Sequence, residues 1–284
     1  ETAVIVRGNK EDPAYAVMRR AIAKARYHTQ QVDSFSAKVY IKGKGKLLDY
    51  PWIAKKMLEK EGITKDRLYI QESVSEIHYK RPAIFREKVI AIFTQGNNNN
   101  TAPNEYVFGS LYEPEIAETI SPLSPKAFSY YRFEYLGIFK DQQFEINKIR
   151  VIPRSKGDNV FDGVINIVED VWSIHSVELN TTKLGIKIHI GQIYNPIPDE
   201  VTRKHVAWLP VTQKFKVEGS VFGVSFTGQY LATIRDYKVY LNPALQHEVA
   251  VLDQKTEVTQ KNQKSASLKK KVESGQPVTT KELN

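Results

Sequence analysis

The sequence contains no cysteine, so it can form neither a disulfide framework nor a thiolate metal site. It also lacks long hydrophobic runs, and no stretch approaches the roughly 20 apolar residues that a membrane-spanning helix needs. No glycine-rich phosphate loop precedes a predicted helix, which argues against nucleotide binding. Because the chain starts with Glu1 instead of methionine, we expect it to be a piece of a longer protein.

Basic residues are in modest excess, and the formal net charge is +9. The segment 253–284 carries seven lysines and four acidic residues, which is +3 and leaves +6 on the remainder. Elsewhere Lys and Arg are scattered between strand residues, whereas a nucleic-acid interface would gather them on one helix or stripe. We therefore expect no nucleic-acid partner, and we interpret the charge as a solvated surface or one that faces an anionic membrane.

The clearest structural signal is a strand-turn-strand pattern from Val160 to Thr182. Two runs rich in Val, Ile, Phe and Trp flank Glu169 and Asp170, which predicts a hairpin with a two-residue loop. Further β-like runs cover 35–47, 67–79 and 83–93, and closely spaced ones continue from 128 to 237. Sequential strands usually pair with their neighbours. We expect a mainly β (α+β) fold in which one large curved antiparallel sheet, or an incomplete β-barrel, has two or three helices packed on it.

Apolar residues at three- and four-residue spacing predict helices over 12–26 and 51–61, and Pro114 to Ile120 is interpreted as a third, short helix. The first two helices are expected to cover faces of the sheet, although the apolar stripe of the first could instead line a ligand pocket and the second could plug or lid the curved sheet. A polar, asparagine-rich loop is expected at 95–104, and a surface helix in the tail at 266–272. The predicted organisation is a linker over 1–11, a half-barrel-like domain over 12–243 and a polar basic tail or linker over 244–284.

Several ordered motifs resemble those of an uncharacterised outer-membrane family of Bacteroides-type bacteria. They include ISPLSPKAFSYYRFEYLG from Ile120, INKIRVIPR, FDGVINIVEDVWSIHSVELN, QIYNPI and WLPVTQKF, and the resemblance covers Val4 to Pro243. It implies a carboxypeptidase-regulatory-like domain before the chain and an outer-membrane β-barrel after it. The strands around Gly163, Trp172 and Trp208 are more distantly similar to periplasmic lipoprotein carriers, in which an incomplete barrel holds acyl chains. This similarity implies a periplasmic, membrane-adjacent module.

The sequence shows no catalytic constellation. His175 and His189 are expected on neighbouring strands, but further metal ligands are not evident, so we predict no metal site and no cofactor. Glu169 and Asp170 could serve as a carboxylate pair, although adjacent turn residues splay apart. Gly219 to Ser225 does not form a nucleophile elbow.

What remains is aromatic and apolar bulk on the sheet and helices, interpreted either as ordinary core packing or as the lining of an apolar cavity. The cavity hypothesis names Trp52, Met57, Phe133, Tyr135, Trp172, Ile174, Phe215 and Phe226. The expected function is a non-enzymatic periplasmic module of an outer-membrane protein that binds a lipid, a lipoprotein or an outer-membrane client. A structural spacer between domains and a hydrolase or carbohydrate-active module remain the alternatives.

Overall fold

The structure is a computed structural model that describes residues 11–60, 62–82, 84–95, 110–116, 118–155 and 159–245. These residues belong to one unit of the chain, 1–247. The predictions for residues 1–10, for most of the asparagine-rich loop and for the tail helix lie outside the described residues. Within them, no helix has the length and apolar character needed to cross a membrane.

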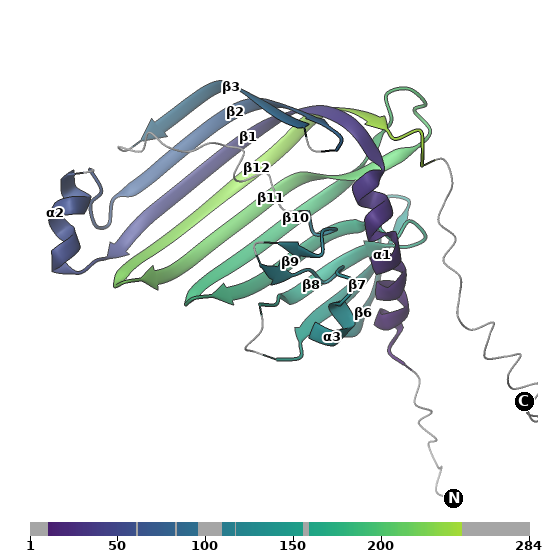
Figure 1. The fold of residues 1–284 in the computed structure, drawn as a ribbon, viewed down its shortest axis with the longest axis horizontal. Helices are drawn as coiled ribbons and strands as arrows, with labels where there is room; N and C mark the ends of the chain where they lie inside the picture. Colours follow the sequence, from purple (N-terminus) through teal and green to yellow (C-terminus); the bar gives the residue numbers. More distant parts are fainter. Residues whose placement is uncertain are drawn as a thin grey trace, which may run out of the picture. The chain divides into compact units, whose positions relative to one another are not determined.

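Ten strands form one antiparallel sheet in the order β3-β2-β1-β12-β11-β10-β9-β8-β7-β6 (Figure 1). The sheet is not closed into a barrel, and β3 and β6 are its edges. The predicted fold class, a large antiparallel sheet with helices, is confirmed. The strands are β1 (Val32–Asp49), β2 (Leu68–Lys80), β3 (Ile84–Gln95), β6 (Tyr131–Asp141), β7 (Phe144–Pro153), β8 (Asp162–Val168), β9 (Ile174–Lys183), β10 (Ile186–Pro198), β11 (Val206–Val221) and β12 (Val224–Leu241).

Helix α1 (Pro13–Gln30) begins where the sequence predicts and continues one turn further. The Asp12 carboxylate caps it by accepting a hydrogen bond from the Ala14 N–H at 2.8 Å. The same oxygen accepts the N–H of Tyr135 on β6 at 3.1 Å, so the cap also ties the helix to the sheet. The buried stripe of α1 consists of Ala14, Val17, Met18, Ala21 and Ala25.

The main hydrophobic core lies between α1 and the strands β6 to β9, which the helix crosses in Figure 1. Ile149, Ile165 and Leu179 point into it from β7, β8 and β9, and each is fully buried. We call this part of the sheet the covered half. The opposite part, formed by β1, β2, β11 and β12, has two small cores, one around Ile41, Ile77, Ala232 and Ile234 and one of Val32, Ala207 and Val239. We call it the open half.

Helix α2 (Trp52–Lys60) differs from the expectation that it would cover a sheet face. None of its residues is buried, and it lies beyond the ends of β1 and β2 (Figure 1). The side chains of Trp52, Ile53 and Met57 point to solvent. Only α1 therefore covers the sheet in the way expected of both helices.

The helix predicted over 114–120 is wrong. Of the residues that the structure describes there, Glu115–Ile116 form the short strand β4 and Thr119–Ile120 form β5. Helix α3 (Ala127–Tyr130) follows them. Glu118 has a left-handed backbone with φ of 61°, which a continuing α-helix does not allow. Spacing of apolar residues alone did not reveal this reversal.

The hairpin at the centre of the sequence is present, but its loop is longer than the predicted two residues. Strand β8 ends at Val168 and β9 begins at Ile174. Asp170 and Trp172, with φ of 63° and 57°, take left-handed conformations in the connection. Trp172 therefore belongs to the turn and not, as expected, to a strand.

Candidate functional site

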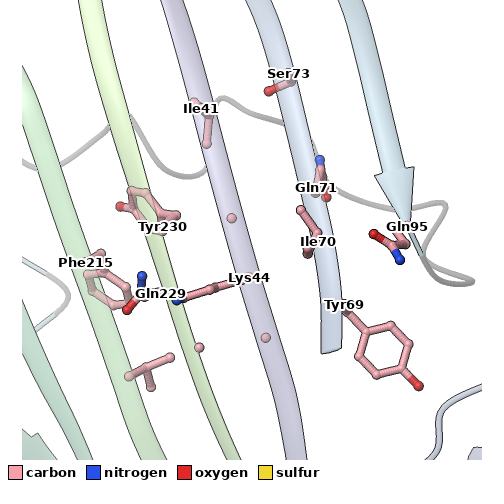
Figure 2. A pocket seen from close by; sticks show the side chains of 14 residues that line it. Ile41, Lys44, Tyr69, Ile70, Gln71, Ser73, Gln95, Phe215, Gln229 and Tyr230 are labelled. Carbon is pink, nitrogen blue, oxygen red and sulfur yellow. The ribbon is translucent and has the colours of Figure 1, made fainter. Parts of the chain in front are cut away.

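A groove of about 260 Å³ lies on the open half of the sheet, on the face that α1 covers elsewhere (Figure 2). Its lining comes from five strands that are adjacent in the sheet, β1 to β3 from the start of the chain and β11 and β12 from more than 100 residues later. The lining residues are Ile41, Gly43, Lys44, Gly45, Tyr69, Ile70, Gln71, Ser73, Gln95, Phe215, Val217, Gly228, Gln229 and Tyr230.

Glycines form the floor of the groove. Gly45 of β1 is paired with Gly228 of β12, and Gly43 lies next along the same face, opposite Tyr230. A Cβ added at Gly45 would meet only the Thr227 carbonyl oxygen, at 3.8 Å, and one added at Gly43 would meet nothing closer than 3.9 Å. The backbone at these two positions therefore does not require glycine, and the missing side chains are what hollow the surface.

Aromatic rings form the two walls. On one side the rings of Phe215 and Tyr230 stack with centroids 5.3 Å apart and planes at 19°. On the other side the Tyr69 hydroxyl accepts the Thr64 N–H at 2.7 Å and donates to the Gly62 carbonyl at 3.1 Å. These bonds tie the Tyr69 wall to the segment that follows α2. Aromatic walls and a backbone floor give the groove a largely apolar surface.

The reverse face of the same strands is charged. Between the groove positions, β1 presents Lys42, whose ammonium lies 2.7 Å from the Glu72 carboxylate. The Tyr40 hydroxyl donates to that carboxylate at 2.9 Å. Hydrogen bonds from Lys42 and Tyr40 lower the pKa of Glu72. Strand alternation thus separates a wet, charged face from the face that carries the groove.

The structure divides the eight residues of the cavity hypothesis among three places. Phe133, Tyr135, Trp172 and Ile174 belong to the core of the covered half or pack against it. Trp52 and Met57 lie on the exposed side of α2. Phe215 and Phe226 lie on the groove face of the open half, and Phe215 alone of the eight lines the groove.

The two candidate histidines do not form a joint site. His175 contacts Asp141, with 2.9 Å between Nε2 and the carboxylate, and His189 contacts Glu178 at 2.7 Å. His189 is paired with Asn180, five residues along β9 from His175, so about 16 Å separates the two positions. Glu169 accepts a hydrogen bond from Asn147 in the covered half, away from the groove. Among the described residues, no group of three or more His, Asp or Glu side chains could hold a metal ion.

The motifs that pointed to an uncharacterised family are matched by a family model over residues 17–237, most of the chain. The chain belongs to the family of unknown function DUF5686. Membership of an uncharacterised family is thereby confirmed, while the Bacteroides-type context and the neighbouring domains stay predictions. No curated protein matches the DUF5686 chain.

Solved structures of low similarity match this DUF5686 chain over nearly their whole length. A DUF1329 family protein from Desulfovibrio piger shares 11% identity at a TM-score of 0.31, and 87% of this chain and 99% of that chain are covered. A LolA superfamily protein from Nitrosomonas europaea shares 10% identity at a TM-score of 0.26, with 81% and 95% covered. A Vibrio parahaemolyticus domain described as an outer membrane lipoprotein-sorting protein shares 12% identity at a TM-score of 0.31, with 86% and 98% covered. Scores of this size carry no argument about function.

The glycine floor of the groove was not predicted from the sequence. The signal was present, since Gly43 and Gly45 interrupt an otherwise regular alternating strand. Glycine inside a strand often marks a place where something approaches the backbone closely. The partner of Gly45 in the floor is Gly228, which lies more than 180 residues away. Only the pairing of β1 with β12 brings the two opposite each other.

Proposed function

We propose that the domain is a non-enzymatic binding module that holds an acyl chain, from a lipid or a lipoprotein, in the groove of the open half. The observation that carries this proposal is the groove itself, a hollow with a glycine floor between aromatic walls on an otherwise regular sheet. In keeping with the resemblance noted in the sequence, we place the module on the periplasmic side of the outer membrane.

The size of the groove favours part of a ligand over a whole one. At about 260 Å³ it is slightly smaller than the roughly 300–1,000 Å³ of typical small-molecule pockets. An extended acyl chain could lie along the floor and leave its polar head outside. Each methylene removed from water contributes about 0.8 kcal/mol, so a short stretch of chain suffices for measurable binding.

One polar side chain of the lining supports the same orientation. Gln71 is paired with Gly43 and carries an amide on the groove face. This amide can donate a hydrogen bond to the carboxylate or ester of an acyl ligand whose tail occupies the apolar part. Lys44 and Gln229, which lie close together in Figure 2, are paired with each other and belong to the reverse face with Lys42.

The test fills the groove without disturbing the fold. Gly45→Leu adds a side chain into the hollow, and its Cβ meets no atom closer than 3.8 Å. Thr227→Leu is the matched control, because it adds a similar side chain on the opposite face of β12. The probe is a dansyl-labelled fatty acid whose fluorescence rises on leaving water. Wild type and Thr227→Leu should bind it alike, and Gly45→Leu should bind about tenfold more weakly, which is 1.4 kcal/mol.

Thermal unfolding of all three proteins provides the control for folding. Equal probe affinity in wild type and Gly45→Leu would contradict a ligand in the groove. No binding by wild type, together with no lipid released by organic extraction of the purified protein, would favour the structural spacer instead.

A further inference from the structure

Large apolar side chains are exposed at one end of the sheet. Trp52, Ile53 and Met57 of α2 are 85%, 74% and 65% exposed, Phe222 of the β11–β12 turn is 97% exposed, and Leu184 of the β9–β10 turn is 89% exposed. We call these five residues the apolar tip. Burying an aromatic or aliphatic side chain is favourable, so five such side chains in solvent indicate an interaction surface.

The members of the apolar tip are neighbours in the fold. A Cβ added at Gly223 would lie 3.5 Å from the Pro51 ring, so the turn that carries Phe222 adjoins the start of α2. The register of β10 with β11 pairs Lys187 with Glu218, which sets Leu184 level with Val221 at the end of β11. In Figure 1 these turns and α2 lie at the same end of the strands.

Lysines surround the apolar side chains of α2. Lys56 and Lys60 follow Trp52 and Ile53 at helical spacings of four and seven residues, so they lie on the same outward side. Among the described residues neither has a carboxylate within 4.0 Å, whereas Lys55 pairs with Glu59 at 3.9 Å. A helix with tryptophan and aliphatic residues beside free lysines is typical of an interfacial segment, because the lysine stems reach past the apolar layer to the headgroups.

We propose that the apolar tip docks the domain on an anionic lipid bilayer. Trp52, Ile53 and Phe222 enter the headgroup and upper acyl region, and Lys56 and Lys60 pair with lipid phosphates. The net charge of +9 adds a longer-range attraction to the same surface. A lipid surface fits better than a protein because isolated turn tips and one short helix offer protruding side chains and no preformed hollow.

Docking by the tip also has a structural link to the groove. Tyr69 forms a groove wall, and its hydroxyl is bound by Gly62 and Thr64, directly after α2. An acyl chain that leaves the bilayer at the tip would therefore meet the groove next. The docking proposal does not depend on the acyl-binding proposal, since a surface can dock whether or not the groove is filled.

Co-sedimentation of the full 284-residue chain with vesicles tests the tip. The probes are phosphatidylcholine vesicles with and without phosphatidylglycerol. The wild type should bind the anionic vesicles, and a Trp52→Ser/Phe222→Ser double variant should bind about tenfold more weakly. Val201→Ser is the matched control, because Val201 is 76% exposed but lies in the β10–β11 turn at the other end of the sheet. All variants keep the lysine-rich tail, so differences among them report the tip.

Further measurements with the same vesicles decide the proposal. Lys56→Gln/Lys60→Gln should weaken binding to anionic vesicles most at low salt, because exposed charges are screened as salt rises. Gly45→Leu should bind vesicles like wild type, so a failure of the groove and a failure of docking can be told apart. Equal vesicle binding by the Trp52→Ser/Phe222→Ser variant and the Val201→Ser control would overturn the proposal. A wild type that binds neither kind of vesicle would overturn it as well. A dimer that the double variant abolishes, without vesicle binding, would assign the tip to a second copy of the chain and overturn it too.

Discussion

The covered and open halves belong to one continuous sheet but differ in what their inner face carries. The covered half presents Ile149, Ile165 and Leu179 to α1, and these side chains are fully buried. The open half presents Gly43, Gly45 and Gly228 at corresponding positions in its strands. Large apolar side chains need a cover to be removed from water, whereas glycine exposes little apolar surface when it stays uncovered. A regular β-scaffold can thus carry a dry core and a binding groove side by side.

The largest expected difference between the halves comes from removing one phenylalanine from each. Phe133→Ala empties a site that is 2% exposed, where the ring packs edge-on against Tyr15 of α1 at 5.9 Å. We expect a loss of about 3–5 kcal/mol in the free energy of unfolding. Phe215→Ala removes a half-buried ring at the groove, where water can enter, and should cost about 1–2 kcal/mol. Urea denaturation of both variants measures the two losses, and equal losses would mean that the open half is packed like a core.

The sequence revealed the strands and α1 because alternation and three-to-four spacing are local patterns. The sequence was less informative about which side chains are buried, because burial depends on segments that are distant in the sequence. The apolar side of α2 has the same periodicity as a core-facing helix, yet Trp52 and Met57 are largely exposed. Phe133 and Phe215 are likewise indistinguishable in a sequence, since only the placement of α1 over one of them separates core from groove.

A second comparison uses one glycine from each half. Gly163 on β8 packs so closely on β9 that an added Cβ would lie 2.1 Å from the Glu178 carbonyl oxygen and 2.9 Å from Leu179 Cα. Both contacts are with backbone atoms, so Gly163→Ala must displace a strand. We expect the free energy of unfolding to fall by about 3 kcal/mol. Gly45→Ala meets no atom closer than 3.8 Å and should change stability by less than about 0.5 kcal/mol.

Thermal or chemical unfolding of the two alanine variants checks this pair. A stable Gly163→Ala protein would show that β8 and β9 can separate without loss, and that the covered half is looser than its packing implies. A strongly destabilised Gly45→Ala protein would show instead that the groove floor is needed for folding.

The smallest of the three effects is a pH dependence confined to the covered half. Burial lowers the pKa of His28, on α1, from 6.5 to about 4, and its buried Nε2 has no hydrogen-bond partner among the residues that the structure describes. The His28 ring becomes protonated below about pH 6.5 in the unfolded chain, but only below about pH 4 in the folded protein. Stability is therefore complete above pH 6.5 and falls as the pH drops through that window, by about 2 kcal/mol between pH 7 and pH 5. Urea denaturation at the two pH values measures this loss.

His28→Phe isolates the histidine, because a phenylalanine keeps a ring beside Tyr112, whose centroid lies 5.1 Å from that of His28. Between pH 7 and pH 5 the free energy of unfolding of His28→Phe should fall by about 2 kcal/mol less than that of wild type. Carboxylates with lowered pKa values, such as Glu72, titrate mainly below this range and cancel in the difference. An identical pH dependence in both proteins would mean that the His28 ring reaches water in the folded state, and that the packing of α1 on the covered half is open at its C-terminal end.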